Sequence, residues 1–386
     1  MKRNVAEAFT RRTSYMRVFK DPKTLVVKVG TSTLTGSTDQ LDESYMESLA
    51  SDLCAQADAG RHVVLVTSGA IRFGSVALKR SNLRGIQEKQ AAAAVGQGLL
   101  MQAYRKLFAR SGRDVGQVLL TRADVEERAR FVNARNTFRK LFSFGVVPIV
   151  NENDTVAVDE IRVGDNDTLA ALVSLVVDAD LLLMLSDVEG FHPSRGAEPL
   201  GMVERLTPEI WAAAGGAGRG GGVGGMRSKL EAANICMSCG IPMIIANGRR
   251  LGVMESVVRG NAVGTLFMSC RRLRGRKRWL AFAPKSRGSI RINDGARGSI
   301  IKRGTSLLPI GVLSADGVFD KGDVVVLCDK EGVEFAKGLT RYTVEEVGRI
   351  AGLKTMQIER TLGAKQSDEV VHRDDLVLTE FNDKDC

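Results

Sequence analysis

Residues 26–36 read VVKVGTSTLTG, and this stretch indicates the fold of most of the chain. It begins as a run of β-branched residues, and a run apolar at all but one position is typical of a strand buried on both faces of a parallel sheet. A glycine and several hydroxyl residues follow, as at a change from strand to helix. Similar runs recur between helical patterns up to about residue 267. We therefore predict an α/β fold, an αβα sandwich whose central sheet is mainly parallel.

The predicted elements of this sandwich alternate along the chain. We expect strands at residues 25–29, 62–67, 116–120, 146–150, 181–185 and 243–246, and helices at residues 44–57, 88–109, 125–142 and 168–177. Further on, the pattern changes to short strands separated by glycine or aspartate turns, at residues 289–292, 324–327 and 335–338. The sequence therefore also predicts a small β-rich C-terminal domain.

Charge and composition indicate the boundaries between these parts. Residues 1–21 form a basic extension, which favours a frayed or helical lead-in over a transit peptide. Residues 271–285 hold a dense run of cations, which we interpret as a solvated linker rather than an RNA-binding surface because few aromatic residues lie nearby to stack bases. We expect the sandwich at residues 22–270, the β-rich domain at residues 286–364 and a tail at residues 365–386.

The composition indicates a globular protein of a reducing compartment. Hydrophobic residues make up 44% of the 386 residues, yet charged residues or glycine interrupt every apolar run before the roughly 18 residues that a membrane span needs. The six cysteines are scattered without the spacing of a disulfide framework. We therefore expect a cytoplasmic protein with no membrane association.

Small and hydroxyl residues gather where the predicted strands end. In open α/β sheets, ligands bind beyond the carboxyl ends of the strands, and such residues leave backbone N–H groups exposed to an anion. One such turn is common in structural proteins, whereas several at one sheet edge favour a binding site. The candidates are Gly30, Thr31, Ser68, Gly69, residues 151–154, Ser186 and Asp187.

Two lysines add positive charge to this pattern. Lys28 interrupts its apolar strand, and burying an unpaired ammonium is costly, so it needs an anionic partner unless it reaches past the sheet edge. Lys229 follows residues 215–225, in which eight of eleven residues are glycine. Such a loop lets backbone approach a polyphosphate closely, or is a flexible linker. It contains a G-x-G-x-x-G pattern, but no predicted strand leads into it, so a dinucleotide fingerprint is weakly supported.

Residues 164–168, GDNDT, stand at a predicted helix start. One residue suffices to cap a helix, so the surplus carboxylates could bind an amine, orient a lysine or hold magnesium through water. The three histidines have no metal spacing, and no serine elbow accompanies them, so zinc and hydrolase sites lack their parts. Cys236 and Cys239 form a C-x-x-C with no second pair, which favours apolar packing. We predict no metal site built from protein ligands.

Four motifs in order resemble the glutamate 5-kinases of the amino-acid kinase family. They are VVKVGTSTLTG at 26–36, VTSGAI at 66–71, NENDTVAVDEIRVGDND at 151–167 and LSDVEG at 185–190. The C-terminal domain, with INDGA at 292–296 and KGLTRY at 337–342, is similar to a PUA domain.

This resemblance, which covers about residues 24–360, implies ATP-dependent phosphorylation of the γ-carboxylate of L-glutamate to L-glutamyl 5-phosphate, the first step of proline biosynthesis. ATP and Mg²⁺ would be the cofactors. The family precedent also suggests a homo-oligomer and feedback by proline.

Carried over by position, the resemblance implies a role for each part of the site. Lys28 and Lys229 would hold the transferring phosphoryl group while Asp167 positions both, which makes these three the predicted catalytic residues. Gly30 and Thr31 would cradle phosphate. A carboxylate substrate is ionised at pH 7 and attacks without a general base, in agreement with the scarcity of histidine. The glutamate-binding positions are Ser68, Gly69, Asp154 and Asn166, and the other ATP-binding positions are Ser186, Asp187, Val223, Gly224, Gly225, Met226, Arg227 and Ser228.

The sequence departs from the family pattern in three places. Val223 stands where a threonine is usual, Arg227 where a small residue is usual, and residues 191–199 are shortened and lack the usual tyrosine. One hydroxyl contact to phosphate and the packing of adenine are therefore open.

Two alternative functions also stay open: another kinase of the family with a different substrate loop, and an RNA-binding protein acting through the PUA-like domain. The motif at 151–167 argues against the first, and the intact lysines and aspartate argue against the second.

Overall fold

The structure, a computed structural model, describes residues 21–36, 41–80, 82–157, 165–215, 225–268, 276–282, 286–364 and 366–379. The chain divides into two compact units, residues 1–270 and 271–386. All of the predicted site residues belong to the first unit.

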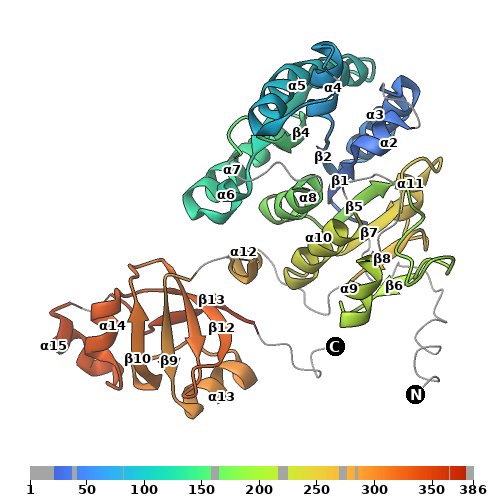
Figure 1. Ribbon diagram of the computed structural model, residues 1–386. Helices are drawn as coiled ribbons and strands as arrows, with labels where there is room; N and C mark the ends of the chain where they lie inside the picture. Colours follow the sequence, from blue (N-terminus) through green and yellow to red (C-terminus); the bar gives the residue numbers. More distant parts are fainter. Residues whose placement is uncertain are drawn as a thin grey trace. The chain divides into compact units, whose positions relative to one another are not determined.

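An eight-stranded sheet of order β3-β4-β2-β1-β5-β7-β8-β6 forms the centre of the first unit (Figure 1). The six longer strands pair in parallel, as predicted, whereas β7 and β8 pair antiparallel. The prediction omitted β6 and β8 because elements of two and three residues show no periodic pattern. The strands are β1 (Thr24–Val29), β2 (His62–Val66), β3 (Val115–Leu120), β4 (Val147–Glu152), β5 (Leu181–Ser186), β6 (Met202–Val203), β7 (Met243–Asn247) and β8 (Thr265–Phe267).

Helices cover both faces of this sheet, which confirms the predicted αβα sandwich. Figure 1 shows α8 and α10 on one side of the central strands and α2, α3 and α11 on the other. Val27 and Val29 pack in one core cluster with Met46 and Leu53 of α3. Because side chains alternate along a strand, Lys28 faces the α8 and α10 layer. The helices are α2 (Thr31–Thr35), α3 (Glu43–Asp58), α4 (Ala70–Ala77), α5 (Gly85–Ala109), α6 (Arg122–Glu126), α7 (Arg128–Ser143), α8 (Asp165–Val176), α9 (Pro208–Ala214), α10 (Met226–Ser238) and α11 (Val253–Val258).

The helix predicted at 125–142 is wrong in detail, because two helices, α6 and α7, occupy this stretch. Glu127 between them has extended backbone, with φ −80° and ψ 122°. A capping box at Thr121, whose backbone N–H donates to the Asp124 carboxylate at 2.8 Å, starts α6 ahead of the predicted boundary. Val125 and Phe131 are both buried, so the apolar pattern runs through the break and conceals it.

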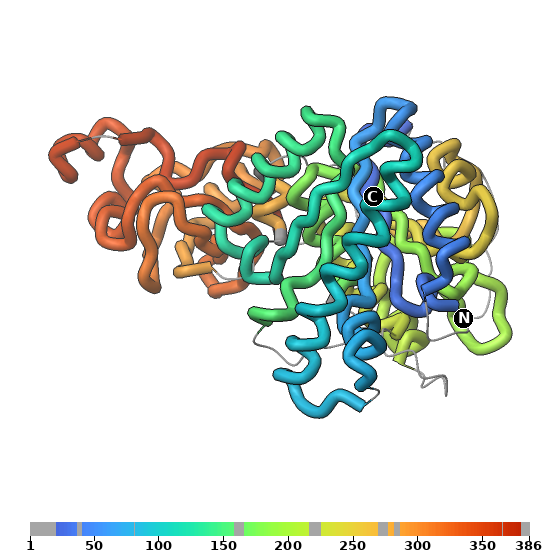
Figure 2. Tube along the Cα trace, turned by 90° about the horizontal axis from the view of Figure 1, so that it is seen from above, coloured from blue at the N-terminus to red at the C-terminus, as the bar shows by residue number. Residues whose placement is uncertain are grey.

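Close packing on α5 holds the start of α4 at the carboxyl end of β2. A Cβ added at Gly74 would lie 1.7 Å from the Ala92 carbonyl oxygen, and one at Gly96 would lie 1.8 Å from the Ala70 carbonyl oxygen. Any side chain at either position would force the two helices apart. The helices lie side by side in both views (Figures 1 and 2). This packing positions Gly69, the residue that precedes α4.

A five-stranded sheet of order β10-β9-β11-β12-β13 forms the second unit, as expected for a β-rich domain. It differs from the expected boundaries in two places, because β13 pairs with β12 within the stretch expected to be a tail, and α12 lies within the expected linker. Arg278 of α12 is buried, so this part of the cationic run is not a solvated linker. The elements are α12 (Arg276–Phe282), β9 (Gly288–Ile292), α13 (Asp294–Arg303), η2 (Pro309–Gly311), β10 (Val312–Gly317), β11 (Val324–Cys328), β12 (Glu334–Thr340), α14 (Val344–Ile350), η3 (Thr355–Gln357), α15 (Ile358–Leu362) and β13 (Val371–Leu378).

None of the described helices is both long enough and apolar enough to cross a membrane.

Cys236 and Cys239 are fully buried and form no disulfide, so the C-x-x-C pattern packs in the core as predicted.

Candidate active site

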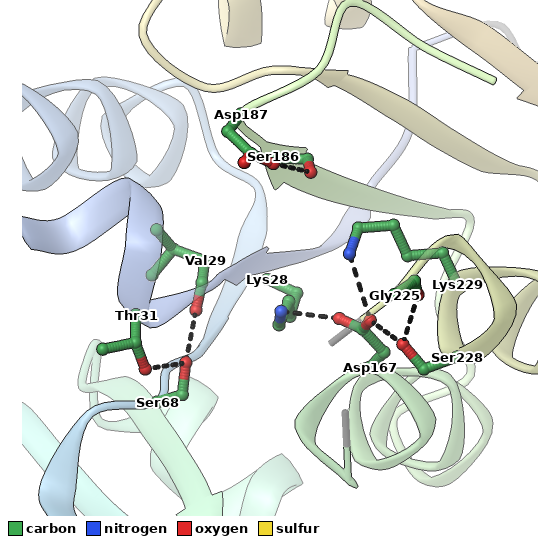
Figure 3. Close-up of polar contacts among 10 residues, drawn as sticks. All are labelled: Lys28, Val29, Thr31, Ser68, Asp167, Ser186, Asp187, Gly225, Ser228 and Lys229. Carbon is green, nitrogen blue, oxygen red and sulfur yellow. Dashed lines mark hydrogen bonds and ion pairs between the residues drawn. The ribbon is translucent and has the colours of Figure 1, made fainter. Parts of the chain in front are cut away.

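Three charged side chains meet in the interior of the first unit (Figure 3). Asp167 lies between two lysines: its Oδ1 is 2.5 Å from the Lys28 Nζ, and its Oδ2 is 3.4 Å from the Lys229 Nζ. The side chains are 8% exposed for Lys28, 10% for Lys229 and 1% for Asp167. The structure therefore brings the predicted catalytic residues together, and Lys28 has its anionic partner within the protein.

Each member of this trio comes from a different element. Lys28 projects from β1, Asp167 lies in the first turn of α8, and Lys229 lies in the first turn of α10. A carboxylate in the first turn of a helix is stabilised by the helix dipole. The Ser228 hydroxyl donates a further hydrogen bond to Asp167 Oδ2 at 2.7 Å. Because α8 and α10 pack against each other, their first turns hold the acid and the second lysine at a fixed separation.

The charges of the trio are unbalanced. Burial lowers the pKa of Lys28, the Lys229 ammonium lowers it further, and Asp167 opposes both effects. Burial alone would raise the pKa of Asp167, but the two ammonium groups and the Ser228 hydroxyl outweigh it and hold that pKa below its usual range. Asp167 is therefore an ionised acceptor rather than a general acid or base. With both lysines protonated, two positive charges face one negative charge in a buried space, which favours an incoming anion.

The turn after β1 lies directly over the Lys28 ammonium. A Cβ added at Gly30 would lie 3.3 Å from the Lys28 Nζ, so the glycine keeps the approach to this group open. Thr31 Oγ1 donates to Ser68 Oγ at 3.3 Å, and that hydroxyl donates to the last carbonyl of β1 at 3.3 Å. Gly69 follows with φ 105°, a conformation that favours glycine. The turns after β1 and β2 are thus joined by side-chain hydrogen bonds.

The other predicted residues at the strand ends approach the same edge. Ser186 is buried and donates to Asp187 Oδ1 at 3.0 Å, whereas Asp187 is exposed and attracts the Lys28 ammonium (Figure 3). Asp154 is partly buried in the turn after β4. Asn166 directly precedes Asp167 on α8, and its Oδ1 is buried with no hydrogen-bond partner among the described residues.

The predicted nucleotide loop is described only at its end. Gly225 is exposed and directly precedes α10, in which Met226 is partly buried. Arg227 is exposed and pairs with Glu231, with Nε 3.5 Å from Oε1, so its guanidinium is engaged along the helix surface. The structure therefore places these residues beside the trio but assigns the Arg227 side chain no contact with it. Val223 and Gly224 lie outside the described residues.

Two polar side chains beneath the strand ends, those of Gln97 and Tyr104, were missed by the sequence analysis. Asn151 Nδ2 donates to Gln97 Oε1 at 2.9 Å, and Asn151 Oδ1 accepts from the Glu152 N–H at 2.9 Å. The hydroxyl oxygens of Thr67 and Tyr104 lie 2.8 Å apart. The Asn151–Gln97 and Thr67–Tyr104 contacts thus support the turns after β4 and β2 from the sheet side. The only available signal was an isolated glutamine in an alanine-rich helical stretch.

No group of histidine, cysteine and acidic residues among the described residues could hold a metal ion by itself. The exposed carboxylate of Asp187, which attracts the Lys28 ammonium, could instead contact the water shell of a Mg²⁺ that is carried by phosphate oxygens.

Comparison with known proteins agrees with this geometry. Residues 23–247 match the amino acid kinase family, and residues 288–362 match the PUA domain. The chain is similar to the glutamate 5-kinase of Moorella thermoacetica, at 51% identity over 362 residues, which is 92% of this chain and 96% of that protein. It is also similar to the glutamate 5-kinases of Syntrophotalea carbinolica, at 46% identity with 92% and 97% of the chains covered, and Myxococcus xanthus, at 46% identity with 93% and 97% covered.

Proposed function

The chain belongs to the amino acid kinase family, and from that premise we propose that it uses ATP to phosphorylate the side-chain carboxylate of L-glutamate. The product is L-glutamyl 5-phosphate, and the reaction is the first step of proline biosynthesis. The observation that carries this function is the buried trio of Lys28, Asp167 and Lys229 at the carboxyl edge of the sheet. The similarity to glutamate 5-kinases over nearly the whole chain supports glutamate as the acceptor.

The trio suits phosphoryl transfer between two anions. Negative charge spreads over the equatorial oxygens of the transferring group in the transition state, and preorganised cations stabilise it without moving. Lys28 and Lys229 supply two such cations, and Asp167 fixes them relative to each other. Because the γ-carboxylate of glutamate is ionised at neutral pH, the reaction needs alignment and charge neutralisation but no general base.

The nucleotide lies, in this proposal, between the turns after β1 and β5. Gly30 and Thr31 bind phosphate over the Lys28 ammonium, and Ser186 and Asp187 bind the nucleotide from the other side. Residues 225–229 approach it from the start of α10, and Val223 and Gly224 are assigned to it by the resemblance alone. Mg²⁺ carried by the phosphates would neutralise part of their charge, with Asp187 as the protein group placed to meet its water shell.

Glutamate binds at the turns after β2 and β4 and at the start of α8. Ser68 and Gly69 offer a hydroxyl and a backbone N–H to its carboxylates. Asn166 offers a buried carbonyl oxygen, and Asp154 a carboxylate, to its α-ammonium group. The Asn166 oxygen has no partner in the described part of the chain; a buried oxygen without one is costly, and a bound ammonium would satisfy it. These assignments account for a substrate with two carboxylates and one amine.

Regulation, assembly and location follow from the same family precedent. We propose a homo-oligomer that is inhibited by proline and works in the cytoplasm. Buried thiols that form no disulfide, such as those of Cys54 and Cys328, agree with a reducing compartment.

The decisive experiment measures ADP release with L-glutamate, L-aspartate and N-acetyl-L-glutamate in parallel, with and without proline. We expect turnover with glutamate at least about tenfold above the other two acceptors, because N-acetyl-L-glutamate lacks the α-ammonium that the site hydrogen-bonds and L-aspartate is one methylene too short to align its side-chain carboxylate. An RNA shift assay at physiological salt accompanies it. Tight RNA binding with no turnover on any acceptor would overturn the proposed function.

A further inference from the structure

A short turn after β7, residues 247–249, is attached to the nucleotide turn after β5. The Gly248 N–H donates to the Ser186 carbonyl oxygen at 2.8 Å. Asn247 Nδ2 donates to Glu189 Oε1 at 2.7 Å. The turn is therefore bound to Ser186, the last residue of β5 and a proposed nucleotide contact, and to Glu189 three residues later.

The last residue of this turn, Arg249, extends to the opposite side and contacts α2 and α3. Its Nη2 donates to the Thr33 carbonyl oxygen at 2.8 Å, and its Nη1 lies 2.7 Å from Asp42 Oδ2. The guanidinium carbon lies 5.0 Å from the centre of the Tyr45 ring. Asn247 Oδ1 accepts from the Arg249 backbone N–H at 2.9 Å, so the backbone of the arginine is held as well. One side chain thus joins the β7 turn to the helix that begins at the phosphate turn.

Two glycines at this turn and its contacts, Gly248 and Gly36, are packed closely against neighbouring atoms. A Cβ added at Gly248 would lie 2.9 Å from Leu185 Cβ and 3.0 Å from Thr33 Cγ2. A Cβ added at Gly36 would lie 2.7 Å from Arg249 Nη2. A Cβ less than 3.0 Å from another atom forces a shift, so a side chain at Gly248 would displace the turn, and one at Gly36 would displace the Arg249 guanidinium. The Arg249 side chain and the turn at Gly248 are therefore fixed by close packing.

A plain surface ion pair is the simpler interpretation, because the Arg249 side chain is 39% exposed and that of Asp42 is 27% exposed. Such a pair contributes little to stability. Arg249, however, engages a carbonyl oxygen and a carboxylate through two separate nitrogens while its guanidinium lies over an aromatic ring, a geometry that a single ammonium nitrogen does not reproduce. The network also runs from Thr33, in the helix that begins at the proposed phosphate turn, to Ser186, a proposed nucleotide contact. These two features favour a functional interpretation.

We propose that Arg249 is a positioning residue for ATP, which fixes the turn after β1 relative to the turn after β5; this inference rests on the proposed function. Gly30 and Thr31 begin the helix that Arg249 holds through Thr33, and Ser186 lies at the other end of the network. The arginine itself touches no nucleotide. Its loss allows the two halves of the ATP site to shift against each other, and a misplacement of about 1 Å can cost on the order of 100-fold in rate.

The test compares Arg249→Ala and Arg249→Lys with Arg250→Ala, a matched control in which an exposed arginine of the next position is removed. Initial rates are measured with ATP and glutamate varied independently, and each variant's thermal unfolding is recorded. We expect Arg249→Ala to lower kcat/KM for ATP by about tenfold or more while KM for glutamate changes by less than about threefold. Arg249→Lys keeps the positive charge but loses the planar guanidinium with its two donor nitrogens. We therefore expect a smaller decrease in kcat/KM for ATP.

Either of two results would overturn the proposal: kinetics of Arg249→Lys and Arg249→Ala that match Arg250→Ala, or equal losses toward both substrates that scale with lost thermal stability. Calorimetric titration with a non-hydrolysable ATP analogue, without glutamate, repeats the comparison independently of turnover. If wild-type protein binds the analogue but does not phosphorylate glutamate, the proposed function fails, while the Arg249 inference still stands or falls on the variants' analogue affinity.

Discussion

Asp167→Asn is the substitution that probes the electrostatic balance of the site most sharply, because it removes one negative charge and keeps the side-chain volume. With an effective dielectric constant of about 20, the attraction of Asp167 is about 7 kcal/mol for Lys28 at 2.5 Å and about 5 kcal/mol for Lys229 at 3.4 Å. Desolvation offsets much of this gross attraction. Removing one partner of a buried ion pair nevertheless costs about 3–5 kcal/mol, because it leaves uncompensated buried charge.

The assay is equilibrium urea unfolding of wild type, Asp167→Asn, Lys28→Met and the double variant. We expect Asp167→Asn to be destabilised by about 3–5 kcal/mol, and we expect the double variant to be more stable than Asp167→Asn because one uncompensated ammonium is gone. The pKa of Asp167 is lowered in the folded state, so its contribution is present above the unfolded value of about 3.9 and is lost as pH falls through the folded value. The stability difference from wild type must therefore narrow at acidic pH. Stabilities that add independently, or an Asp167→Asn protein within about 0.5 kcal/mol of wild type, would refute the reasoning.

Three further predictions use other parts of the structure. Gly30→Ala places a methyl group 3.3 Å from the Lys28 Nζ, and we expect initial rates to show kcat/KM for ATP about tenfold lower with an unchanged melting temperature. Calorimetry should show ATP binding weakening as pH rises through the pKa of Lys28, at lower pH than the ordinary 10.5, because burial lowers that pKa and deprotonation removes the attraction for phosphate; constant affinity up to pH 10 would contradict this. Gly96→Ala forces a methyl group within 1.8 Å of the Ala70 carbonyl oxygen, and we expect urea unfolding to show a loss of about 1–3 kcal/mol.

Local patterns predicted the parts of the site that sit on strands and at their ends. The apolar run around Lys28 was enough to place it in a buried strand and to require an anionic partner, because the cost of an unpaired buried ammonium holds whatever surrounds it. Strand ends meet at one edge of a parallel sheet, so the grouping of Ser68, Ser186 and Asp187 at the edge where that lysine lies also followed from the order of elements. Which acid would pair with Lys28 was not accessible from spacing, since Asp167 is far from it in the chain, and it came from the resemblance.

Contacts that depend on tertiary packing could not be predicted. Nothing in the sequence near Arg249 points to Thr33, more than two hundred residues earlier, because a guanidinium on a loop looks like any exposed charge. The pairing of Gln97 with Asn151 is hidden for the same reason. Short or interrupted elements were also missed: β8 is too brief for periodicity, and the extended residue between α6 and α7 lies within a continuous apolar pattern.

The claim at the centre of this account is that two lysines, held by one buried aspartate, stabilise the phosphoryl group as it moves from ATP to glutamate. Single-turnover transfer from labelled ATP to glutamate, compared between wild type, Lys229→Ala and the exposed-lysine control Lys106→Ala, tests it most directly. We predict that Lys229→Ala slows the transfer step by about 100-fold or more, because a preorganised transition-state contact is worth that much, while ATP affinity falls far less and the control is unchanged. A transfer rate in Lys229→Ala equal to that of the control would contradict the account.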